Sequence, residues 1–206
     1  MFSSNIAGIS WPDNPLIPTI NQCLQEDDLP YHLTEYTVVH YEKDDGYGTL
    51  NSCMELTEYP RIIPKENEIL HNQAVSPALQ LLSAAVYHLA NAEFLNALEN
   101  HRKGDFSDCL TKCNSAFEST MKIICEQKKI TFGQTDSAAS LLKAIISNSN
   151  LDNFWAQPLM LIATLRNRLS SSHGAGSQAK VVPRHVATYA INATAAAIVL
   201  LTSEFA

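Results

Sequence analysis

The feature that most constrains the fold is an apolar, alanine-rich tract near the C-terminus, Val186 to Thr202. It is about 17 residues long and is interrupted by two threonines and an asparagine, so it falls short of the roughly 20 apolar residues that a membrane helix needs. Pro183 stands where a helix can start without losing a hydrogen bond. We therefore predict a buried helix from Pro183 to about Phe205 at the centre of a soluble protein, with alanines that let neighbouring helices approach closely.

Apolar residues spaced three and four apart predict four further helices upstream of this tract. Ser76 and Pro77 are typical of a helix start, and this helix should run to about Arg102. Gly104 should end it, and Asp105 should cap the next. The other predicted helices are 105–128, 136–147 and a helix that Asp152 caps. Five helices with short connections predict a mainly α protein with an up-and-down bundle.

Residues 1–75 have a different composition, rich in prolines and in β-branched and aromatic residues. The predicted elements are a short helix at 16–25, strands at 34–41 and 49–57 around a turn at 43–48, and a third short strand at 61–63. A hairpin alone is marginally stable in water, so this appendage must pack on the helices. We interpret His32, His40 and His71 as surface or packing residues.

Charge divides the chain at the same place. Residues 1–75 hold 3 Lys/Arg and 12 Asp/Glu, a net charge of −9, whereas residues 76–206 hold 11 and 9, a net charge of +2. We therefore predict two parts, an acidic N-terminal segment (1–75) with a regulatory role and a helical domain (76–206). A total of −7 argues against broad nonspecific binding of nucleic acid, so any RNA site must be local.

The five cysteines follow no disulfide or zinc spacing. Cys109 and Cys113 are one helical turn apart, but core packing of small thiols explains them better than a metal pair. The N-terminus lacks the basic region and apolar run of a signal peptide. We therefore expect a cytoplasmic protein without a metal or other cofactor and without a membrane association.

The stretch LRNRLSSSHGAG, residues 165–176, should close the fourth helix. If the helix persists through the serines, Arg166, Ser170 and His173 share one face, and Arg168 lies about 140° from His173. A guanidinium offers a planar fork of donors to phosphate oxygens, and an imidazole exchanges a proton near neutral pH. Together they fit phosphodiester chemistry on RNA. The alternative is that both arginines are solvated and that the histidine caps the helix.

A resemblance adds to this motif. The segment HRKGDFSDCLTKCNSAFESTMKIICEQKKI (His101 to Ile130), followed after a gap by LRNRLSSSHGAG, is similar to the C-terminal domain of abortive-infection proteins, a branch of the HEPN superfamily. The likeness covers about residues 76–206. An arginine, a polar residue, a spacer and a histidine resemble the HEPN signature, which Arg166 and Asn167 begin and His173 ends.

The resemblance implies a metal-independent endoribonuclease toxin that acts in antiphage abortive infection. Arg166 and His173 would be catalytic, with Asn167 supporting them and Arg168 binding RNA. In the family a polar or acidic residue on the 105–128 helix often faces the active centre, which suggests Glu118, although a solvated glutamate is the alternative. We expect a homodimer whose partners include an antitoxin or a sensor protein. The alternative function is a noncatalytic HEPN-like dimerisation or binding module of a defence or toxin–antitoxin system.

Overall fold

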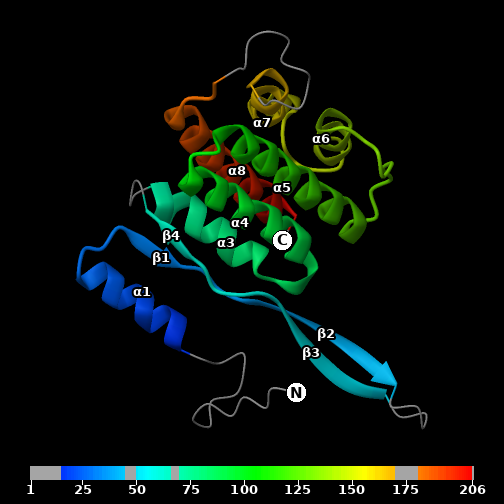
Figure 1. Cartoon of the computed structure of the whole chain (residues 1–206). Helices are drawn as coiled ribbons and strands as arrows, with labels where there is room; N and C mark the ends of the chain where they lie inside the picture. Colours follow the sequence, from blue (N-terminus) through cyan, green and yellow to red (C-terminus); the bar gives the residue numbers. More distant parts are fainter. Residues whose placement is uncertain (1–14, 45–49, 66–69, 170–180, 206) are drawn as a thin grey trace.

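The computed structural model describes residues 15–44, 50–65, 70–169 and 181–205. Figure 1 shows a bundle of helices with a small set of strands and one helix against one side of it. Helices α5 and α8 lie inside the bundle, α6 and α7 cover one side, and α3 and α4 cover the other. The N-terminal strands lie beyond α3 and α4, far from α7 in this view. The chain is therefore mainly α with a small β appendage, as the sequence predicts.

Most helices of the bundle have the predicted bounds because their ends are marked by local capping residues. The bundle helices are α3 (Ser76–Leu82), α4 (His88–Lys103), α5 (Phe106–Gln127), α6 (Ala138–Ile146), α7 (Ala156–Leu169) and α8 (Arg184–Glu204). Gly104 ends α4 with φ of 82°, a left-handed conformation that glycine adopts without strain. The side chain of Asp105 then accepts a hydrogen bond from the backbone N–H of Asp108 at 3.1 Å.

The start of the bundle differs from the prediction in two ways. The predicted helix 76–102 is interrupted, because Ala84 is extended with ψ of 138° and a single 3₁₀ turn, η2 (Ala85–Tyr87), leads into α4. Ser76 is not an N-cap, since it is helical (φ −62°, ψ −47°) and follows a π-helical turn, η1 (His71–Val75). The prediction failed because apolar residues continue through the break at helical spacing.

The N-terminal segment contains α1 (Leu16–Glu26), as predicted, and two separate two-stranded sheets. Strands β2 (Thr37–Asp44) and β3 (Leu50–Glu58) form the predicted antiparallel hairpin, in which Tyr41 pairs with Cys53. The predicted third strand is β4 (Ile62–Pro64), but it does not join the hairpin. It pairs instead with β1 (Tyr31–Leu33), with His32 opposite Ile63. This pairing is nonlocal, so no turn signal in the sequence indicates it. The turn predicted at 43–48 lies mostly outside the described residues.

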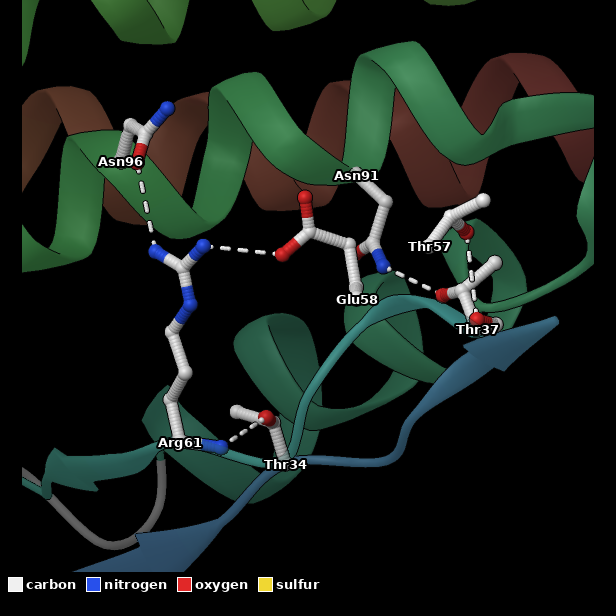
Figure 2. A network of polar contacts seen from close by, with 7 residues as sticks. All are labelled: Thr34, Thr37, Thr57, Glu58, Arg61, Asn91 and Asn96. Atoms are coloured by element: carbon white, nitrogen blue, oxygen red, sulfur yellow. Dashed lines mark hydrogen bonds and ion pairs between the residues drawn. The ribbon is translucent and has the colours of Figure 1, made fainter. Parts of the chain in front are cut away.

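Polar contacts join the strands to α4 (Figure 2). The Nδ2 of Asn91, 3% exposed, donates to Thr37 Oγ1 at 2.9 Å. The guanidinium of Arg61 donates to Asn96 Oδ1 at 3.2 Å and to Glu58 Oε2 at 2.8 Å. Because buried polar groups are costly to leave unpaired, these bonds fix the segment on α4 and do not leave it as a free arm.

The core is divided into two clusters that meet along α5 and α8. Cys109, Cys113 and Cys125 are fully buried in these clusters, which confirms the packing role predicted for the first two. Among the described residues, α8 is the one helix long and apolar enough to cross a membrane, with a mean hydropathy of 1.6 over its apolar stretch. Of this stretch, 50% is buried inside the protein. Its residues contribute to both clusters, including Ile198 and Leu201 at 0% exposure, so α8 is a core helix of the bundle, as predicted.

Candidate active site at the end of helix α7

The inward face of α7 is defined by its apolar residues. Leu159, Ile162 and Ala163 are buried, with exposed fractions of 3–5%, in the cluster that α7 shares with α5 and α6. Arg166 follows them by seven, four and three residues, spacings that return to the same side of a helix. Its side chain therefore starts on the inward face of the last turn of α7.

Arg166 has an unusual environment for an arginine at a helix end. The side chain is half-buried, and its Nη1 donates to Asn167 Oδ1 at 2.9 Å. Its Nε is buried and has no hydrogen-bond partner among the described residues. An unpaired buried donor costs about 1–3 kcal/mol. An anionic oxygen that accepts a hydrogen bond from this Nε would remove that cost, and the C-terminal end of the helix dipole favours the cation itself.

The other residues of the motif are either exposed or outside the described residues. Asn167 and Arg168 are exposed on the last turn of α7. Asn167 is the neighbour that accepts from Arg166, and Arg168 also has an interaction partner. Ser170 and His173 lie outside the described residues, so the predicted shared face of Arg166, Ser170 and His173 stays a prediction.

Glu118 lies half-buried on α5, which packs against α7. The next residue, Ser119, faces α4 and donates to Glu93 Oε2 at 2.6 Å, and Glu118 lies about 100° from it around the helix. Met121, three residues after Glu118, packs in the cluster with α6 and α7 residues. Helical spacing puts Glu118 about 60° from Met121, at the edge of this buried face, and both its position in the site and its role stay predictions.

Asn114 is a polar residue of this region that the sequence pattern alone does not single out. It lies one helical turn before Glu118, is 6% exposed, and its Oδ1 is buried without a hydrogen-bond partner in the part of the chain that is described. A signal is present in the sequence, because Asn114 stands among the apolar residues Leu110, Cys113 and Phe117. Such a position favours either a packing defect or a functional acceptor.

Thr194 of α8 repeats this pattern. It is 0% exposed, and its Oγ1 also lacks a partner within the described residues. Helices α5, α7 and α8 contact one another pairwise, and each contributes one buried polar atom without a partner, from Asn114, Arg166 and Thr194. Three of the four such atoms in the described part of the chain therefore belong to these contacting helices, and each calls for an explanation, such as a catalytic role or a bound water or ion.

The described residues contain no group of three or more His, Cys, Asp or Glu side chains that could hold a metal ion. The candidate side chains on α5 and α7 are instead guanidinium groups, amides and one carboxylate. This donor set suits an anion better than a divalent cation, because amide and guanidinium N–H groups bind phosphate oxygens directly.

The fold and this site define a class, a helical bundle with an Arg-Asn motif on the last turn of a helix that covers one side of the bundle. The chain belongs to the Abi_C family: the family model, described as a HEPN-like domain, matches residues 88–205, more than half of the 206 residues. No curated protein and no solved structure matches the chain. The match begins with the first residue of α4, so α3 and the N-terminal segment lie outside it.

Proposed function

We propose that the protein is a metal-independent endoribonuclease of the HEPN type. The 2′-OH of the RNA attacks the adjacent phosphorus, forms a cyclic phosphate and releases the 5′-oxygen of the next nucleotide. His173 moves the proton as general base or acid, and Arg166 binds the phosphate and offsets the charge that develops on it. Asn167 hydrogen-bonds RNA or holds the end of the helix, and Arg168 contributes an exposed cation for the backbone.

The observation that carries this proposal is the environment of Arg166. It begins the HEPN-like motif, it projects from the inward face of α7, and its buried Nε has no acceptor among the described residues. A merely solvated arginine would expose its guanidinium to water. Membership of the family of HEPN-like domains supports the proposal, and abortive infection of phage-infected cells is the role that we assign to the activity.

The test is cleavage of total RNA and of defined single strands by the purified full chain. Activity should survive EDTA, 2′-deoxy substrates should be inert, and products should carry a cyclic phosphate end. Cleavage of a deoxy strand would contradict attack by the 2′-OH. Loss of activity on chelation, restored by a divalent ion, would contradict the metal-independent mechanism even though the family assignment would remain.

The second candidate is a noncatalytic dimerisation or binding module. The observation that favours it is the hydrogen bond from Arg166 to Asn167, which already engages one nitrogen of the guanidinium within the chain. In this case the arginine holds an anion or a neighbouring subunit and no bond is cut. Binding of uncleavable RNA or of a partner protein, together with intact RNA after long incubation, would support this candidate over the nuclease.

A further inference from the structure

An open groove of about 750 Å³ lies where the N-terminal strands meet the bundle. Its lining comes from β1, from β4 and the residue before it, from the C-terminal half of α4 and from the first residue of α8. The residues are Tyr31, Arg61, Ile62, Pro64, Glu99, Arg102 and Arg184. Its volume is within the roughly 300–1,000 Å³ typical of ligand sites. This groove is separate from the inward face of α7.

Three arginines line this groove, although the chain as a whole carries a charge of −7. Arg102 and its neighbour Lys103 both bind Glu99 Oε1, at 2.7 and 3.2 Å, and Arg61 binds Glu58. Counting Arg61, Arg102, Lys103 and Arg184 against these two glutamates leaves a local charge of +2. The groove is therefore a local cationic site of the kind that an acidic protein needs to bind RNA.

The cations of the groove are accessible to a ligand. The side chain of Arg102 is 53% exposed and that of Arg61 is 36% exposed, and Arg184 is exposed. An arginine that binds one carboxylate with two of its nitrogens still has further N–H donors. A phosphate can therefore bind Arg102 without first breaking its ion pair with Glu99.

Exposed apolar groups stand beside the arginines. Tyr31 is 45% exposed and Ile62 is 64% exposed, on paired strands whose register sets Leu33 opposite Ile62. An exposed aromatic ring beside cations is the combination that binds single-stranded nucleic acid, because bases stack on the ring while the cations contact the phosphates. An acidic peptide would use the arginines but would gain little from the ring.

We propose that this groove binds the phosphate backbone of single-stranded RNA as an accessory site, with Arg102 and Arg184 on the phosphates and Tyr31 against a base. The inference rests on the proposed function, since it assigns a second contact for the same substrate. Arg184 is the first residue of α8, so the groove draws its cations from both the N-terminal strands and the bundle.

The experiment measures binding of a short 2′-O-methyl oligonucleotide by fluorescence anisotropy over a series of salt concentrations. This probe has no free 2′-OH and cannot be cut by the proposed mechanism. The double variant Arg102→Gln/Arg184→Gln should bind at least about tenfold more weakly. The slope of log affinity against log salt should become shallower by about 0.7 for each phosphate that the variant no longer binds. Arg61 is left unchanged because it also anchors the strands to α4.

The matched control is Lys128→Gln/Lys143→Gln, which removes two exposed cations outside the groove and makes the same change in total charge. It should bind like the wild type. Tyr31→Ala should weaken binding about fivefold or more, whereas Tyr31→Phe should not, because the ring is what stacks. Glu99→Gln should strengthen binding, since it removes a carboxylate from the groove. Thermal unfolding of each variant checks that the fold is retained.

Equal binding by the two double variants would overturn the proposal, and so would poly-glutamate that binds the groove while the oligonucleotide does not. Cleavage is followed separately with an unmodified strand. Groove-dependent binding without any cleavage would support the groove and contradict the nuclease. Cleavage with binding that ignores Arg102 and Arg184 would contradict the groove and leave the nuclease standing.

Discussion

The imidazole rings of His32 and His71 lie with their centroids 4.8 Å apart, at the place where β1 meets the helical turn that precedes α3. Burial is the main cause that lowers the pKa of each ring to about 4, and the positive charge of Lys65 adds to it. His32 itself further lowers the pKa of His71. Both histidines are thus neutral packing residues at neutral pH, in agreement with the interpretation from the sequence.

This pair predicts a loss of stability in mild acid. Because the folded pKa values are about 4 and the unfolded ones are near 6.5, the unfolded chain takes up protons first as the pH falls. The stabilisation is complete above about pH 6.5 and is lost as the pH falls from there toward 4. Between pH 7 and 5 the free energy of unfolding should fall by about 2 kcal/mol, mostly through His71, after the shift of half-buried His32 is discounted for solvent.

Urea unfolding at the two pH values gives the measurement. His71→Phe removes the titrating group and should reduce this pH dependence, whereas His40→Gln, on the exposed part of β2, should leave it unchanged. The same pH dependence in His71→Phe and in the wild type would show that other groups cause it.

Substitutions in the motif should separate catalysis from binding. His173→Ala should abolish turnover, since general acid or base catalysis alone contributes about 10² to 10⁴ in rate. Arg166→Ala should be comparably damaging, whereas Arg168→Ala should mainly weaken RNA binding and make the affinity less sensitive to salt, because one phosphate contact is lost. Single-turnover cleavage at saturating RNA measures the difference. Full activity of Arg166→Ala would remove this residue from the site.

Asn114→Leu tests whether the buried Oδ1 of Asn114, which has no partner among the described residues, has a functional role. Replacing a lone buried acceptor with an apolar group of similar size should raise the free energy of unfolding by up to about 1 kcal/mol. If Oδ1 orients Arg166 or the substrate, RNA cleavage should nevertheless fall by about tenfold. Thr194→Val is the companion variant on α8. If the Asn114→Leu protein is more stable and cleaves RNA as well as the wild type, Asn114 is only a packing defect and has no role in cleavage.

A homodimer built through the helical half is expected, because one arginine and one histidine make a sparse site. Two copies facing across a two-fold axis would line one cleft with Arg166 and His173 from each chain. Light scattering at micromolar concentration should give the mass of two chains. A monomer that still cleaves RNA would disprove this arrangement.

If the acidic N-terminal segment restrains the site, deleting residues 1–70 should raise activity. The structure adds a condition to this experiment, because Ile63, 4% exposed, packs in the bundle core and Asn91 depends on Thr37 for a hydrogen bond. The deletion should lower the free energy of unfolding by several kcal/mol. Circular dichroism melts reveal that loss, and an unchanged melting temperature would contradict it.

A milder variant therefore tests the restraint itself. Glu42→Gln/Glu55→Gln neutralises two exposed carboxylates of the hairpin and keeps the fold. If negative charge on this segment repels RNA, the variant should bind and cleave RNA better, most clearly at low salt. Since the described part of the segment lies on the side of the bundle away from α7 (Figure 1), the effect should be long-range and should vanish at high salt.

The parts of the fold that could be predicted depend on nearby residues. Gly104 and Asp105 mark the turn between α4 and α5 by themselves, and the apolar stripe of α5 indicates its buried face. The break at Ala84 could not be predicted in this way, because the chain bends there to let η2 contact β2. The pairing of β1 with β4 is equally invisible, since the partners are about 30 residues apart and no turn joins them.

The candidate site was predictable only in part for the same reason. The position of Arg166 on the inward face of α7 follows from helical spacing to Ile162 and Ala163. What helical spacing does not indicate is whether a polar atom finds a partner on another helix. Within the described residues, the Oδ1 of Asn114 and the Oγ1 of Thr194 lack partners, which becomes visible only when α5, α7 and α8 are packed together.

Arg61 takes part in two features of the fold. It joins the strands to Asn96 of α4 by a hydrogen bond, and it lines the groove where the N-terminal strands meet the bundle. A phosphate that also contacts Arg61 competes with Glu58 and Asn96 for its guanidinium. By thermodynamic reciprocity, a ligand that weakens the Arg61–Asn96 hydrogen bond must itself bind more tightly when that bond is already broken. Docking of the N-terminal strands on the bundle is therefore thermodynamically coupled to ligand binding in the groove. Arg61 is the residue that couples them.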